Sequence, residues 1–142
     1  MPTKVNRWKV PGRERVDVWF ETELSGMLSA DVNLVGVLNK VVVGTIHAVD
    51  APVDWTVVSA AGAFNVLLIE PDTEGNNAVT DVLMGYCSDV NATSTEVVHP
   101  RVDTGASDNI GLPVHGRYMM TVSDGATAGT EAVGVVRLYL EQ

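Results

Sequence analysis

The feature that most constrains this fold is a series of short apolar runs, rich in β-branched residues and divided by turn signals. Residues 41–46 read Val-Val-Val-Gly-Thr-Ile, and residues 16–21 alternate apolar with other side chains as a half-buried strand does. Residues 32–38 fit a strand or a short helix, and their valines with Gly36 favour the strand. Further strands are predicted at residues 55–58, 64–69, 78–86, 115–122 and 133–140.

About eight short strands without a long amphipathic helix are typical of antiparallel all-β folds. The sequence therefore predicts an all-β class: an antiparallel β-sandwich, a jelly-roll-like fold or a partial barrel. A chain of 142 residues with 46% hydrophobic residues is long enough for one domain with its own core. Its single cysteine, Cys87, excludes an internal disulfide, and we expect this side chain to be buried as a small apolar group.

Charge is distributed unevenly along the chain, whose net charge is −9. Residues 1–15 carry five cations against Glu14, a net of +4, whereas the rest carries four cations against seventeen acids, a net of −13. This asymmetry, with Pro11-Gly12 as a turn, predicts an extended basic arm over residues 1–15 and a single β domain over residues 16–142. We expect the arm to bind a partner through these residues: Lys4, Arg7, Trp8, Lys9, Arg13 and Arg15.

Three partners suit such an arm: nucleic acid, the acidic surface of a neighbouring subunit, or another protein. The alternative is a solvated tail without a partner. The acidic body disfavours specific nucleic-acid binding and anionic membranes. No apolar run reaches the length of a membrane span, and no apolar segment typical of a signal peptide follows residues 1–4.

The sequence offers no constellation for catalysis. His47, His99 and His115 lie at no metal-ligand spacing, and no glycine-rich loop has the form that cradles phosphates. We therefore expect no enzyme activity, no catalytic or metal-binding residues and no cofactor. Residues 87–111 are poor in apolar side chains and predict a long surface excursion, in which only Val97-Val98 is suited to strand pairing.

The C-terminal segment resembles the ending of small bacteriophage virion proteins. Gly116-Arg117-Tyr118 begins an aromatic strand, a Gly/Ala/Thr turn follows at residues 125–129, and the chain closes on Val136-Arg137-Leu138-Tyr139-Leu140-Glu141. Residues 49–54 and the Asp/Thr/Gly-rich excursion suit the same group. The resemblance implies a capsid-associated β protein, and it carries over no functional residue, because such proteins have no active site.

Together these features predict a capsid decoration (cement) protein, made in the host cytoplasm and located in the virion. Its partners would be the capsid protein shell and copies of itself, in a homo-oligomer for which a trimer is favoured. Two alternatives stay open: a jelly-roll coat subunit, and a carbohydrate- or receptor-binding β-sandwich module. The net charge of +4 on the arm is low for a coat protein that packages a genome.

Overall fold

The computed structural model describes residues 3–22, 28–45, 64–70, 81–88, 90, 95–103, 108–124 and 132–142. These residues form an all-β structure, as predicted, and among them no helix has the length and hydropathy needed to cross a lipid bilayer. The strands are β1 (Thr3–Val10), β2 (Arg13–Thr22), β3 (Leu28–Thr45), β4 (Phe64–Ile69), β5 (Glu96–Val98), β6 (Arg101–Asp103), β7 (Asp108–Ile110), β8 (Leu112–Asp124) and β9 (Ala132–Glu141).

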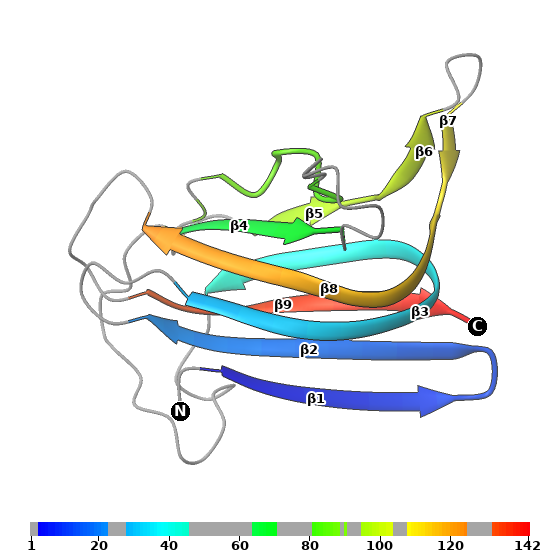
Figure 1. The fold of residues 1–142 in the computed structure, drawn as a ribbon, viewed down its shortest axis with the longest axis horizontal. Coiled ribbons are helices and arrows are strands. Elements are labelled where there is room, and N and C mark those ends of the chain that lie inside the picture. Colours follow the sequence, from blue (N-terminus) through cyan, green and yellow to red (C-terminus); the bar gives the residue numbers. More distant parts are fainter. Residues whose placement is uncertain are drawn as a thin grey trace.

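One antiparallel sheet contains seven of these strands, in the order β1-β2-β9-β3-β8-β4, with β5 also paired to β3 (Figure 1). The sheet is open rather than closed into a barrel, since its path ends at β1 and at β4. β6 and β7 form a separate two-stranded ribbon, which projects from the end of the molecule where β8 begins (Figure 1).

The long strand β3 belongs to both halves of the sheet. Residues 28–38 pair with β8, and residues 37–45 pair with β9 after a register shift between Leu38 and Lys40. The strand curves strongly in this region (Figure 1), where Gly36 adopts a φ of +128°. A Cβ at Gly36 would collide with the main-chain oxygen of Glu141, so glycine is required there. The run predicted at residues 32–38 and the described part of the run at 41–46 are thus parts of one bent strand, and residue 46 lies outside the described residues.

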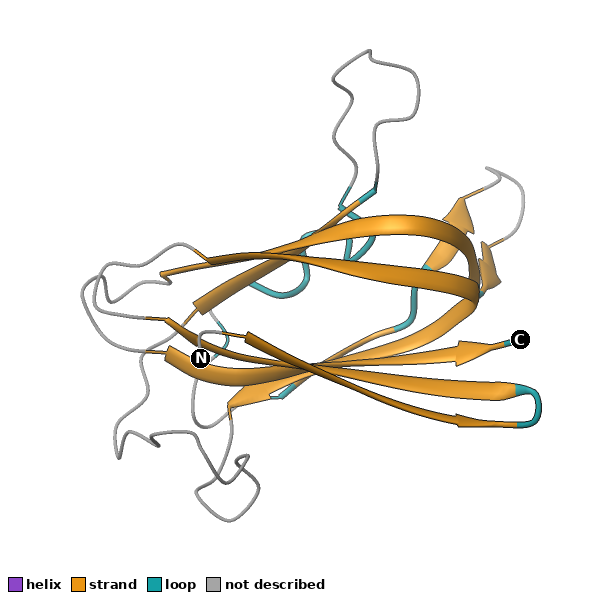
Figure 2. Cartoon of the chain, turned by 60° about the horizontal axis from the view of Figure 1, so that its bottom comes forward, coloured by secondary structure: helices purple, strands orange, loops and turns teal. Residues whose placement is uncertain are grey.

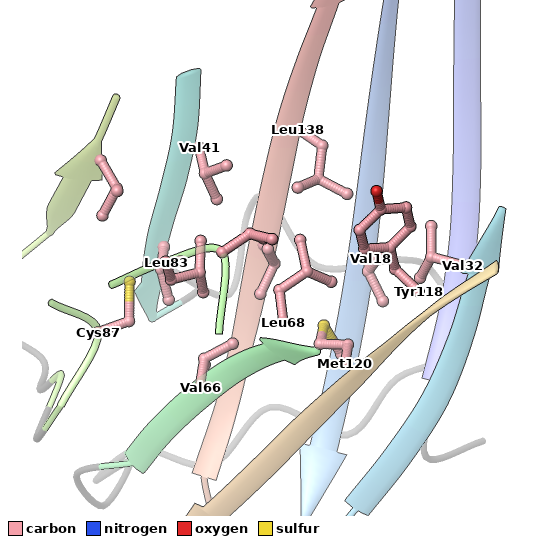
Figure 3. Packing of buried hydrophobic residues seen from close by; sticks show 14 of the residues in the cluster. Val18, Val32, Val41, Val66, Leu68, Leu83, Cys87, Tyr118, Met120 and Leu138 are labelled. Atoms are coloured by element: carbon pink, nitrogen blue, oxygen red, sulfur yellow. The ribbon is translucent and has the colours of Figure 1, made fainter. Parts of the chain in front are cut away.

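The curvature folds the sheet over itself, so that its two halves face each other as layers (Figure 2). Phe20 of β2 meets Phe64 of β4 edge to face, with ring centroids 4.9 Å apart, although these strands are far apart in the sheet order. The core fills the space between the layers with alternate side chains of the long strands (Figure 3). Burial of this apolar surface is what holds the two layers together.

The strands predicted at residues 16–21, 64–69, 115–122 and 133–140 are confirmed, and so is the pairing of Val97-Val98, which lies in β5. The strand predicted at residues 78–86 is wrong over its described part, where Asp81 makes an isolated bridge to Ile69 and a turn follows. The ribbon of β6 and β7 within the predicted excursion was not foreseen. The strand predicted at 55–58, the turn at 125–129 and His47 lie outside the described residues.

The Asp81 side chain explains the turn. Its Oδ1 accepts hydrogen bonds from the Leu68 and Leu83 amides, both at 3.0 Å, and its Oδ2 accepts one from Gly85 at 2.9 Å. Met84 and Gly85 then take positive φ values of 56° and 74°. A carboxylate that binds nearby amides in this way competes with strand pairing and favours a turn. The apolar residues of the segment predicted a strand and gave no sign of this turn.

Cys87 is buried in the core, as predicted, with 1% of its surface exposed. Burial, with smaller contributions from Asp81 and Glu96, raises the pKa of its thiol to about 12. The reactive thiolate is then about a thousandfold rarer near pH 8 than in an ordinary cysteine. We expect negligible labelling by a thiol reagent in native buffer and complete labelling in urea, read by mass spectrometry. Rapid labelling of the folded protein would contradict this placement.

Candidate functional site

The predicted N-terminal arm is extended, and over its described part it belongs to the sheet. β1 pairs with β2 from Thr3 opposite Phe20 to Val10 opposite Arg13, and Pro11 and Gly12 make the turn. The boundary predicted at residue 15 therefore falls inside β2. An edge strand buries little apolar surface, so β1 shows no apolar period that would have revealed it. We call residues 3–22 the N-terminal hairpin.

Strand alternation divides the predicted arm residues between the two faces of the hairpin. One group shares the outer face, namely Lys4, Trp8, Arg13 and Arg15. In the pairing of β1 with β2, Lys4 lies opposite Trp19, Trp8 opposite Arg15 and Val10 opposite Arg13, and residues that lie opposite each other or two positions apart share a face. Arg7 and Lys9 lie on the other face, with the core residues Val16 and Val18. The six residues predicted as one partner-binding set thus form two groups.

Arg7 has a structural role. Its Nη2 donates a hydrogen bond of 2.6 Å to the main-chain oxygen of Asn33, and its Nη1 lies 3.4 Å from Oε1 of Glu14. Asn33 lies in the part of β3 that pairs with β8, in the opposite layer. Arg7 therefore fastens the edge strand to the facing layer instead of offering its charge to a partner.

On the outer face, aromatic and cationic side chains alternate across four neighbouring strands. Trp8 of β1 is opposite Arg15 of β2, Arg15 is opposite Tyr139 of β9, and Tyr139 is opposite Lys40 of β3. The Arg15 Cζ lies 4.3 Å from the Trp8 ring centroid, and the Lys40 Nζ lies 4.9 Å from that of Tyr139. These are cation–π contacts. We call these four residues the cation–aromatic row.

A buried carboxylate lies beside the row, two residues after Arg15 on the same face of β2. Asp17 is fully buried, with Arg15 Nε 3.2 Å from its Oδ1 and Arg137 Nε donating a 3.2 Å hydrogen bond to its Oδ2. Burial raises the pKa of Asp17, and the two guanidinium groups act in the opposite direction. Both arginines bind Asp17 through Nε, so their terminal nitrogens are not used in this contact. The contact of Asp17 with Arg15 is an ion pair without hydrogen-bond geometry, and it holds the Arg15 guanidinium beside Asp17 by charge.

Trp19 is buried although it lies on the outer face of β2. The Arg137 Cζ lies 5.8 Å from its ring centroid, so this arginine links Asp17 and Trp19. Sequence reasoning missed Asp17, Lys40, Arg137 and Tyr139 as members of one surface. The only local signal was the position of Arg137 and Tyr139 on the polar face of an alternating strand.

A groove of about 610 Å³ lies along the row. Its walls include Trp8, Tyr139 and three cations, namely Arg13, Arg15 and Lys40. Two acids also line it, Glu14 and Glu141, and Glu14 forms the ion pair with Arg7. The groove is therefore locally cationic on a chain whose overall charge is negative.

Among the described residues, this groove brings cationic and aromatic side chains together. Within them no group of three or more His, Cys, Asp or Glu side chains is arranged to hold a metal ion. His99 and His115 are exposed, and the Nδ1 of His99 lies 3.4 Å from the main-chain oxygen of Asn39. Comparison of the chain with protein-family models, with curated proteins and with solved structures gave no significant match.

Proposed function

We propose that this chain is a structural protein of a bacteriophage particle, a capsid decoration protein that contacts its neighbours through the N-terminal hairpin. The observation that carries the proposal is the open edge of β1, which within the described residues pairs with β2 alone. This edge strand exposes three large apolar side chains, Val5, Trp8 and Val10, at 41%, 47% and 58% of their surface.

The opposite edge of the sheet differs in this respect. The outer side of β4 is covered by main-chain hydrogen bonds between Phe64 and Val90, from Val66 to Cys87, and from Val82 to Leu68. An uncovered strand edge is a template for association with another chain, and folded proteins usually blunt such edges. A long edge that is unpaired within the described part of the chain and carries exposed apolar groups is suited to contact with a neighbouring subunit.

Charge supports a contact between unlike surfaces. Residues 1–15, which include β1 and the start of β2, carry a net +4 and the rest of the chain a net −13, so this part of one copy is complementary to the body of another. Such a head-to-tail contact closes into a ring when its rotation permits, which is consistent with the trimer expected from the sequence. On a symmetric shell each weak contact is repeated, so the assembly gains strength by multivalency.

The groove favours a second candidate, a carbohydrate- or receptor-binding β-sandwich module. Trp8 and Tyr139 both line it, and exposed aromatic rings are common anchors for ligands. This candidate ranks second because Arg15 and Lys40 already lie over these rings, which leaves less of each face for a sugar.

The decisive variant is Trp8→Ala combined with Val10→Ala, measured by size-exclusion chromatography with light scattering. We expect the native chain to form an oligomer, and the double variant to have a lower mass with an unchanged circular dichroism spectrum. Removing residues 1–15 is a poorer test, because it deletes β1 and part of β2.

The matched control is Val35→Ala, which alters an exposed apolar side chain on β3, in the segment paired with β8. It should leave the mass unchanged. A native chain that is monomeric, or an oligomer that the double variant does not weaken, would contradict assembly through the hairpin. Glycan binding by a monomeric chain would instead support the second candidate.

A further inference from the structure

We infer that the groove along the cation–aromatic row binds an extended acidic peptide segment, and that this segment is residues 70–74 of a second copy of the chain. The inference rests on the proposed function and deepens it, because it names the surface and the chemistry of the contact between copies. The argument begins from the three cations that line the groove, Arg13, Arg15 and Lys40.

Two of these cations, Arg15 and Lys40, are held in place before any partner arrives. Arg15 is fixed by the buried Asp17 at 3.2 Å and by stacking on Trp8, and Lys40 lies over Tyr139. Ordering a long cationic side chain usually opposes binding, so cations that are already ordered bind an anion at a smaller entropic cost. The guanidinium group of Arg15 keeps its terminal nitrogens for a carboxylate, a geometry that favours paired hydrogen bonds.

The spacing of the cations fits an extended peptide. Arg13 and Arg15 lie two residues apart on the same face of β2, a separation of about 6.8 Å. Acids at alternate positions of an extended segment have the same separation, because every second side chain points to the same side. A segment that carries acids two residues apart therefore matches both arginines at once.

One segment of the chain carries three acids at alternate positions. Residues 70–74 read Glu-Pro-Asp-Thr-Glu, which puts three acids at alternate positions, and no other window of five residues in the sequence holds three acids. No lysine or arginine occurs anywhere between Lys40 and Arg101. The segment and the groove are thus complementary in sign and in spacing.

A nucleic acid is the other polyanion that three cations suggest, but the charge of the chain argues against it. A phosphate backbone longer than the groove would continue over a body with a net charge of −13. A short acidic segment ends where the cations end and meets only the two acids that line the groove, Glu14 and Glu141, and Glu14 is paired with Arg7.

The first test is titration of the full-length protein with a synthetic peptide of residues 69–75, followed by calorimetry. We expect saturable binding that weakens as salt is raised, and no binding of a peptide whose three acids are replaced by their amides. The double variant Arg13→Gln/Lys40→Gln should weaken binding about tenfold. The control Arg117→Gln, an exposed cation on β8 that lies near Asp31, should bind as the native chain does.

The second test identifies the occupant as another copy. We expect Arg13→Glu/Lys40→Glu and Asp72→Lys/Glu74→Lys each to lower the mass in light scattering, and an equimolar mixture of the two variants to regain it. Equal binding of the amide peptide, equally tight binding of a short oligothymidylate, or a mixture that stays dissociated would overturn the inference. If the native chain is monomeric, the proposed assembly fails, whereas the peptide titration still decides what the groove recognises.

Discussion

Replacing Phe20 by alanine is expected to lower the free energy of unfolding by about 4 kcal/mol. The ring is completely buried and meets Phe64 across the two layers, with centroids 4.9 Å apart. It also covers Gly134, its cross-strand partner, since a Cβ built there would lie 2.5 Å from Phe20 Cζ. A cavity at this point borders on Gly134, which has no side chain that could fill it.

Urea unfolding followed by circular dichroism measures this loss. Val5→Ala is the matched control, because Val5 pairs with Val18 at the sheet edge and 41% of its surface is exposed, and it should cost less than about 1 kcal/mol. Similar losses for the two variants would show that the contact between the layers is not where the stability lies. The fold-over of the sheet would then need another explanation.

Replacing Asp81 by alanine is expected to cost about 3 kcal/mol, because it leaves the amides of Leu68, Leu83 and Gly85 without their acceptor. Asp81→Asn keeps an oxygen that can replace Oδ1, so it should lose chiefly the Gly85 bond and cost about 1 kcal/mol. Urea unfolding measures the free energies, and hydrogen exchange of the Leu68 amide reports the local opening.

The Asp81 variants also bear on assembly, because the turn after Asp81 leads into the segment that covers the outer edge of β4. Opening this segment exposes a second strand edge, so Asp81→Ala should also form aggregates that the asparagine variant does not. Equal stability of the two variants would refute the role assigned to the carboxylate.

The strands that the sequence predicted are those whose alternate residues bury apolar side chains in the core. Val16, Val18 and Phe20 behave in this way on β2, and residues 133–140 behave similarly on β9. β1 was predicted only as an extended arm, since its side chains are mostly exposed and its pairing leaves no hydrophobic period. The turn at Asp81 was hidden for the opposite reason, because Val82 and Leu83 are buried as strand residues would be.

The candidate site was predictable only in part. Trp8 and the cations of residues 1–15 were recognisable from composition and charge. Tyr139 and Lys40 join them because the last strand, β9, inserts between β2 and β3, which brings residues 15, 139 and 40 into one row. No local pattern encodes a pairing between residues so distant in sequence, and nothing in the sequence distinguishes Asp17 from the other sixteen acids of residues 16–142.

The two partners of β3 have a consequence for how the molecule opens. One continuous backbone supplies hydrogen bonds to β8 over residues 28–38 and to β9 over residues 37–45. Loss of either set of pairs leaves part of β3 unpaired and removes one wall of the shared core, so opening of one layer weakens the packing of the other. We therefore expect the two layers to open cooperatively, and under the proposed function a neighbour bound to the hairpin would also lower the population of openings on the β4 side.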